Sequence, residues 1–251
     1  MNDTPRDSEK AGEPLKRAGS RRRIAILVAA VLLLYAIAAY LVAPEIWERY
    51  VKRHPSLDDV PGITLTKAGI PGDPLNVALI GTEAEVKGIM AAAEWYPADS
   101  LSLRSDLRIA ADTVLERQYD DAPVSSLYLF GRKEDLAFEQ PVGRDPRHRN
   151  HVRFWRSEKK DPDGRPVWVG SATYDERVGL SHTTGQITHH IGANIDAERD
   201  RLFDDLRRTG DLTETYAVDG FHKVLKGHNG GGDPWHTDGR LFVGVIALKQ
   251  P

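Results

Sequence analysis

Histidine and arginine gather between residues 147 and 200, where five of the nine histidines of the 251-residue chain lie. In residues 151–156 polar side chains alternate with apolar ones, which is typical of a β-strand with two different faces. His151, Arg153 and Trp155 should share one of these faces. Because guanidinium and imidazole groups both donate hydrogen bonds to oxyanions, this face is suited to holding an anionic group.

The chemistry that fits these residues best is the recognition or hydrolysis of a phosphoester. Arginine binds phosphate oxygens through two parallel N–H groups, and histidine can exchange a proton near neutral pH. A helix predicted to begin near Asn194 would add backbone N–H donors for an anion. The candidates are His151 and His189 for catalysis, and Arg153, Arg199, Asp175 and Asp196 for binding the ligand or orienting the histidines.

A purely structural role for the same residues is the main alternative. Arg153 and Arg199 could pair with carboxylates close to them, such as Asp196 or Glu198, and His151 could be a hydrogen-bonded histidine inside a sheet. The two interpretations predict different geometries, because only a ligand site requires the basic side chains to meet in one pocket.

A histidine metal site is a further alternative and would use His148, His151, His182 and His189. On a regular strand His148 and His151 point to opposite faces, so both could bind one ion only if the chain curled. No His-Glu-x-x-His sequence or comparable spacing is present. We therefore expect neither a metal nor another cofactor.

Residues 227–239 form a glycine-rich segment that also contains Asp233 and Asp238. Their spacing fits neither the loop that binds nucleotide phosphates nor the calcium loop of an EF-hand. We expect a solvated loop here.

Composition excludes several classes of function. The net charge is −3, and residues 43–251 carry 27 basic and 33 acidic groups, a net charge of −6. A mildly acidic globule is a poor binder of nucleic acid, which requires a high density of basic residues, so we expect no nucleic-acid partner. The chain has no cysteine, which excludes disulfides, iron–sulfur clusters and thiolate zinc sites.

The elements that must position the candidate residues are mostly strands. Alternating and apolar runs predict about seven strands, largely antiparallel because short turns connect them. Helices are expected at residues 82–93, where Thr82 and Glu85 fit a capping box, at 102–116 and at 194–208. The predicted fold is α+β, a mostly antiparallel sheet with helices packed on one side.

Two hairpins follow from the turn residues between predicted strands. Residues 151–156 and 167–175 are separated by an Asp-Pro-Asp-Gly turn and should pair. Residues 126–130 and 136–142 are separated by a medium-length loop and should form a second hairpin.

One segment is suited to crossing a membrane. Residues 24–42 are 19 uncharged, mainly aliphatic residues that follow Arg21-Arg22-Arg23. As a helix they would span about 28 Å, enough for the hydrocarbon core of a bilayer. The preceding 15 residues hold six Lys/Arg and the following 15 hold three, which predicts an N-terminus in the cytoplasm and a C-terminal domain across the membrane.

The expected organisation has four parts. Residues 1–23 are a disordered cytoplasmic tail and 24–42 a single transmembrane helix, retained as an uncleaved signal anchor. Residues 43–61 form a juxtamembrane stalk, and 62–251 form one globular domain. The expected location is therefore a membrane, with the C-terminal domain on its extracytoplasmic side.

Five motifs combine glycine, proline and charged residues in a fixed order. They are Pro71-Gly72-Asp73-Pro74-Leu75-Asn76-Val77, Ala122-Pro123-Val124-Ser125-Ser126-Leu127-Tyr128-Leu129-Phe130-Gly131-Arg132, Arg149-Asn150-His151-Val152-Arg153-Phe154-Trp155, Asp196-Ala197-Glu198-Arg199-Asp200 and Asn229-Gly230-Gly231-Gly232-Asp233-Pro234. Together they resemble the LssY C-terminal family over about residues 62–248. The family is similar to the terminal part of larger bacterial membrane proteins with phosphatidic acid phosphatase and DedA-like segments. The resemblance implies a place near lipid metabolism and assigns no reaction.

Three functions remain open. The first is an anchored envelope domain that binds a phosphorylated lipid or another anionic ligand, as an accessory to lipid metabolism or transport. The second is a phosphoesterase-type hydrolase that uses His151 and His189. The third is a protein-interaction module of an envelope complex.

Overall fold

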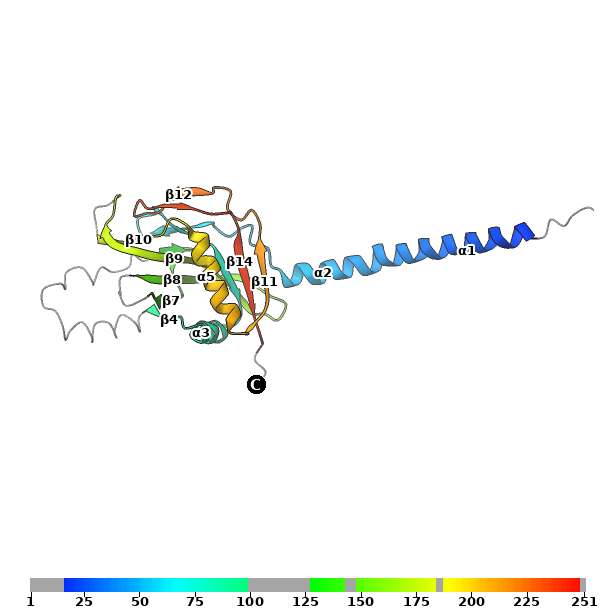
Figure 1. Cartoon of the computed structure of the whole chain (residues 1–251), viewed down its shortest axis with the longest axis horizontal. Helices are drawn as coiled ribbons and strands as arrows, with labels where there is room; N and C mark the ends of the chain where they lie inside the picture. The colour runs from blue at the N-terminus through cyan, green and yellow to red at the C-terminus, as the bar shows by residue number, and fades with distance from the viewer. Residues whose placement is uncertain (1–15, 99–126, 143–147, 184–186, 249–251) are drawn as a thin grey trace, which may run out of the picture. The chain divides into compact units, whose positions relative to one another are not determined.

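The computed structural model describes residues 16–98, 127–142, 148–183 and 187–248 (Figure 1). The helix expected at 102–116 lies outside these residues. The chain divides after His54 into two compact units.

The first unit is a helix that continues from α1 (Lys16–Ile37) through the π-helical turn η1 (Ala38–Val42) into α2 (Ala43–Arg53). In the π turn the Ala43 N–H bonds to the carbonyl of Ala38, five residues back. Pro44 accounts for this turn, because its ring lacks an N–H and would collide with the carbonyl four residues earlier in a regular helix.

Residues 22–53 of this unit are long and apolar enough to cross a membrane, by length and composition. Their most apolar stretch is not buried against any part of the chain that the structure describes. Within α2, exposed ion pairs join Glu45 to Arg49 at 3.0 Å and Glu48 to Lys52 at 2.6 Å. Such pairs, four residues apart and open to solvent, add little to helix stability because water screens them.

An eight-stranded sheet forms the centre of the second unit (Figure 1). Seven strands lie in the order β11-β14-β3-β9-β8-β7-β4, and β10 pairs with β9. Only β3 and β14 run parallel within this sheet, so the expected α+β fold with a mostly antiparallel sheet is confirmed. The strands are β3 (Val77–Ile80), β4 (Tyr96–Pro97), β7 (Leu136–Pro141), β8 (Arg149–Lys160), β9 (Pro166–Leu180), β10 (Ile187–Ile191), β11 (Leu212–Val218) and β14 (Leu241–Ile246).

Two helices cover one face of the large sheet (Figure 1). The helix α3 (Glu83–Ala92) begins with the expected capping box, in which Thr82 and Glu85 each accept a backbone N–H of the other. The helix α5 (Ile195–Arg208) begins at Asn194, whose side chain accepts the Ala197 N–H. Their apolar faces share a core with side chains of the sheet, including Ile89, Met90, Val152, Phe154, Leu202 and Phe203.

The other face of the large sheet is also covered. Trp155, Val167 and Val169 lie in a second core with Leu75 and Leu127, which belong to the segments around a small sheet. The face shared by His151, Arg153 and Trp155 is therefore buried rather than open to solvent. The small sheet has the order β2-β1-β5-β6, formed by β1 (Ile63–Thr66), β2 (Pro71–Pro74), β5 (Leu127–Leu129) and β6 (Arg132–Lys133).

One hairpin prediction is confirmed and the other is wrong. The strands β8 and β9 pair as expected, with Arg153 opposite Ser171. The strands β5 and β7 lie in different sheets instead of pairing. The reason is that Phe130 and Gly131 both have positive φ, 53° and 75°, which closes a tight two-residue turn directly onto β6.

The glycine-rich segment is a hairpin and not the expected solvated loop. Its strands are β12 (Lys226–His228) and β13 (Pro234–His236). Asn229 shapes the turn between them, because its side-chain oxygen accepts the N–H groups of Gly231 at 3.0 Å and Asp233 at 2.9 Å. The glycines thus lie in the turn and leave three residues on each side to pair.

Candidate functional site

The face of β8 that lies away from the helices changes from apolar to polar along the strand. Trp155 lies in the apolar core, and Arg153 and His151 follow it toward the start of the strand. The register places His151 opposite Thr173 and Arg149 opposite Asp175 on β9. Because directly opposite residues share a face, β8 and β9 together build a buried polar layer at this end of the sheet.

His151 lies between two carboxylates. Its Nε2 is 2.7 Å from Oδ2 of Asp175, and its Nδ1 is 3.7 Å from Oε1 of Glu139. Arg149 in turn donates to Glu139 at 3.0 Å. His151, Asp175 and Glu139 are all buried, so both ring nitrogens of the histidine face negative groups within the fold.

Arg153 faces Asp73 of β2, with 3.6 Å between Nη1 and Oδ2. Asp73 also accepts a hydrogen bond from the side chain of Asn229 at 3.2 Å. Burial raises the pKa of Asp73 above its ordinary value, although Arg153 and Asn229 act in the opposite direction. The nearby carboxylates of Asp175 and Asp233 also raise this pKa, so three buried acidic groups influence one another.

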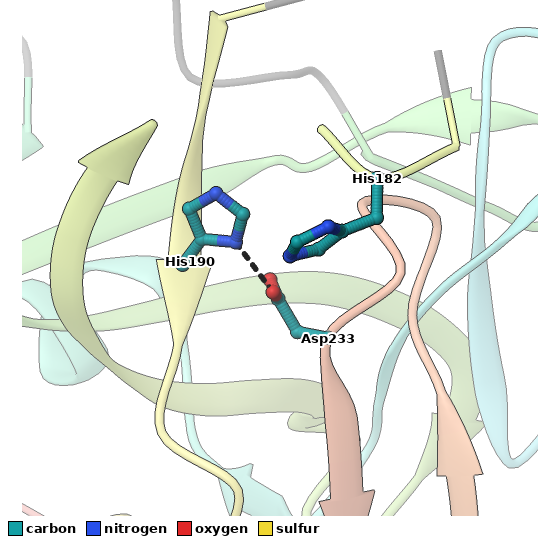
Figure 2. A group of neighbouring side chains, drawn as sticks. All are labelled: His182, His190 and Asp233. Carbon is teal, nitrogen blue, oxygen red and sulfur yellow. Dashed lines mark hydrogen bonds and ion pairs between the residues drawn. The ribbon is translucent and has the colours of Figure 1, made fainter. Parts of the chain in front are cut away.

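Asp233 connects this layer to the histidines of the neighbouring segments (Figure 2). Its Oδ1 is 2.5 Å from Nδ1 of His190 on β10, and its Oδ2 accepts the N–H of Ile191 at 3.3 Å. The ring of His182 lies beside that of His190, with 5.3 Å between the ring centroids. His190 and Asp233 are buried, whereas His182 is exposed.

The Nε2 atom of His190 forms no hydrogen bond with any of the described residues, although only 2% of the side chain is exposed. Burying an imidazole nitrogen without a partner is unfavourable by roughly 1–3 kcal/mol. A buried polar atom of this kind is a common feature of sites that bind a ligand or an ion.

Glu198 on α5 approaches the polar layer from the helix side. Burial raises its pKa to about 8, and the carboxylates of Asp205 and Asp175 add to the increase. Arg201 acts in the opposite direction. Glu198 therefore carries a proton over much of the neutral pH range.

Arg199 and Asp196 form a separate network at the start of α5. The Arg199 guanidinium is 1% exposed and donates to Asp196 at 3.0 Å and to both oxygens of Asp238 at 2.8 and 3.1 Å. It also donates to Asp200 at 2.9 Å and lies 4.1 Å from the ring centroid of Phe242. Burial opposes ionisation of Asp238, but hydrogen bonds from its arginine neighbours hold the pKa of this carboxyl well below its ordinary value.

The structure thus places the site residues predicted from sequence in two separate groups, one around His151 and one around Arg199. It brings His151 and Asp175 into contact and places Arg153 next along the same face. Arg199 and Asp196 have their own partners at the start of α5. His189 lies in β10, where its backbone pairs with Val178 of β9, but its side chain lies outside the described part of the structure.

Several residues of the polar layer were not selected as its members from sequence, among them Asp73, His190 and Asp233, as well as Glu139 and Arg149 beside His151. The two aspartates share a local signal, because each is the centre of a Gly-Asp-Pro triplet. In the structure Asn229 hydrogen-bonds to both, at 3.2 Å to Asp73 and 3.4 Å to Asp233. A repeated short motif could therefore have indicated that they act together.

A second feature lies on the β12–β13 hairpin. A groove of about 560 Å³ is lined by residues of both strands. The side chains of Lys226, His228 and His236 are exposed there, and the register places Lys226 opposite His236. Val224 and Leu225, directly before β12, are 63% and 47% exposed. The hairpin therefore combines three nitrogen-bearing side chains with an apolar pair.

Comparisons with known proteins give one match. A family model described as LssY C-terminus matches residues 57–241, which include the polar layer and the hairpin groove. No curated protein and no solved structure matches the chain.

Proposed function

Because the chain belongs to the LssY C-terminal family and carries one helix suited to crossing a membrane, we propose that it is a membrane-anchored domain of the bacterial cell envelope. Its proposed ligand is a phosphorylated lipid headgroup or a similar anion. The excess of Lys/Arg before residue 24 supports an N-terminus in the cytoplasm and a domain on the periplasmic side of the inner membrane.

The groove on the β12–β13 hairpin is the observation that carries this proposal. The Lys226 ammonium and the imidazoles of His228 and His236 can donate hydrogen bonds to phosphate oxygens. No carboxylate in the described residues forms an ion pair with Lys226. The exposed side chains of Val224 and Leu225 add apolar surface that suits the acyl part of a lipid.

The arginines chosen from sequence are less suited to this task. Arg199 already donates to three carboxylates, and Arg153 faces the buried Asp73. An anion at Arg153 would leave the buried carboxylate of Asp73 without compensation, which is strongly unfavourable, and an anion at Arg199 would have to displace three carboxylates that already bind it. We therefore assign binding of the anionic ligand to the β12–β13 hairpin.

The two alternative functions draw less support from the geometry. Both nitrogens of His151 face carboxylates, which favours a buried polar contact over proton exchange with a substrate. A protein-interaction module would be favoured by a bare sheet surface around His151, but this face is covered.

Binding of a soluble short-chain lipid tests the proposal. The detergent-solubilised full chain is titrated with dihexanoyl phosphatidic acid, with dihexanoyl phosphatidylcholine as the zwitterionic comparison. We expect Lys226→Glu to weaken binding of the phosphatidic acid by at least about tenfold, because it replaces a charge-assisted hydrogen bond with repulsion.

The matched control is Lys87→Glu, which reverses an exposed lysine on α3 that is 53% exposed. It should leave the affinity unchanged. Equal affinities of the native chain and Lys226→Glu, or equal binding of the two lipids, would overturn the proposal.

A further inference from the structure

Three side chains that commonly bind metals converge from distant parts of the sequence (Figure 2). His182 follows β9, His190 lies on β10, and Asp233 directly precedes β13. One ring nitrogen of each histidine and one carboxylate oxygen all lie within 4.8 Å of one another. We propose that His182, His190 and Asp233 form a binding site for a divalent transition-metal ion of the zinc type.

The set of ligands fits this class of ion. Two imidazoles and one carboxylate are typical of zinc sites that keep a fourth position open for water or a substrate oxygen. Ligand atoms around a tetrahedral zinc ion are separated by roughly 3.3 Å, given bond lengths near 2.0–2.1 Å. The His190 Nδ1 and Asp233 Oδ1 atoms, 2.5 Å apart, would have to separate slightly to bind one ion, whereas His182 would have to approach them, and its exposed side chain has the freedom to do so.

Backbone contacts hold the three ligands near one another. The N–H of His182 bonds to the carbonyl of Gly231 at 2.8 Å, which ties this residue to the hairpin turn. A Cβ atom at Gly232 would lie 2.7 Å from Cβ of His182, so glycine permits this close approach. The φ of Gly232 is also +88°, a conformation that other residues rarely adopt.

The local charge also favours a cation. Asp233 and Asp175 each lie near the buried carboxylate of Asp73, and in this layer Arg153 faces Asp73. A divalent ion would compensate negative charge that the described cations balance only in part. Arg177 lies opposite His190 in the β9–β10 pair, but it is exposed and water screens its charge.

One imidazole cannot bind the same ion through both of its nitrogens, and Nδ1 of His190 is the nitrogen that faces Asp233. The unpartnered Nε2 therefore shows only that the buried hydrogen-bond groups around His190 do not complete one another within the described residues. The open side of the cluster is that of His182, through which an ion and its water could enter. The proposal does not depend on lipid binding at the hairpin groove.

Cobalt binding tests the site directly. The purified full chain in detergent is treated with a chelator, freed of it, and titrated with Co²⁺ while the visible spectrum is recorded. We expect a low-symmetry cobalt spectrum that saturates at one ion per chain and that Zn²⁺ displaces. Asp233→Asn and His182→Ala should each weaken Co²⁺ binding by about tenfold or more.

His182→Ala keeps the test independent of folding, because this side chain is exposed. The double substitution His228→Ala and His236→Ala removes two exposed histidines of the hairpin and serves as the control. Its cobalt affinity should equal that of the native chain. A native chain without a saturable spectrum, or a control that loses as much affinity as His182→Ala, would overturn the metal site.

Discussion

Two buried polar regions of this protein differ in how completely their hydrogen bonds and charges are matched. Both connect the segment of residues 229–240 to the neighbouring strands or to α5. Around Arg199 the donors meet three carboxylates, a backbone carbonyl and an aromatic ring. Around His190 one ring nitrogen has no partner among the described residues, and the buried carboxylate of Asp73 lies close to Asp233.

This difference separates a structural network from a candidate ligand site. A buried charge whose partners are complete stabilises one arrangement of the chain and has no capacity left for a ligand. An incomplete set has such a capacity, because an ion or a polar molecule can supply the missing contacts. The residue types alone do not distinguish the two regions, since both combine basic groups with aspartates.

The largest predicted effect is in the complete network. Arg199→Met should lower the free energy of unfolding by about 3–5 kcal/mol, because it removes several charge-assisted hydrogen bonds to the partly exposed Asp196 and Asp238, each worth about 1.5–3 kcal/mol. Urea unfolding followed by circular dichroism measures this change. The control Arg207→Met, at an exposed position of the same helix, should cost less than about 0.5 kcal/mol. Equal losses of unfolding free energy in the two variants would contradict a structural role for the Arg199 network.

A smaller effect on the free energy of unfolding is expected when a metal ion binds to the group of side chains around His190. Zn²⁺ at 100 times its dissociation constant should raise the free energy of unfolding of the native chain by about 2.7 kcal/mol, since only the folded site binds the ion well. In His182→Ala, whose affinity should be about tenfold lower or more, this stabilisation should fall to about 1.4 kcal/mol or less, while the metal-free stability stays within about 0.5 kcal/mol of the native value. Equal stabilisation of both proteins by Zn²⁺ would show that the ion binds elsewhere.

The third predicted effect is a pH dependence of stability and concerns Glu198, which lies next to Arg199 in sequence. Burial raises its pKa to about 8 from an ordinary value of 4.5. The folded state therefore binds more protons than the unfolded state between these values, so stability falls as pH rises through this window. The slope is at most about 1.4 kcal/mol per pH unit, and the loss levels off above the folded pKa.

Glu198→Gln should remove this part of the pH dependence, because the amide cannot ionise. Unfolding midpoints measured from roughly pH 5 to pH 9 should converge at low pH and favour the variant at high pH. Parallel profiles for the two proteins would contradict the raised pKa.

Much of the local structure was predicted from sequence. The capping box at Thr82, the cap at Asn194 and the pairing of residues 151–156 with 167–175 are all confirmed. These features depend on residues close together in the chain, where side-chain type limits the backbone directly. The hairpin expected from residues 126–130 failed because a tight turn at Phe130 and Gly131 took precedence over the longer loop.

The candidate site was predicted only in part. Alternation correctly placed His151, Arg153 and Trp155 on one face of β8, but it could not show that other segments cover this face. In β10 the register shifts between His190 and Ile191, so alternation counted from sequence does not show which side chains of this strand meet Asp233. The metal ligands also lie too far apart in the chain for any spacing rule.

Local sequence patterns were enough to predict the apolar helix, the class of fold and the family, because periodicity, capping and motif order act over short stretches of chain. Which buried charged groups have all their partners depends instead on how distant segments pack. Sheet order brings Asp73, His190 and Asp233 together while α5 gives Arg199 partners of its own. Whether a buried charge is satisfied depends on distances between segments that no local pattern records.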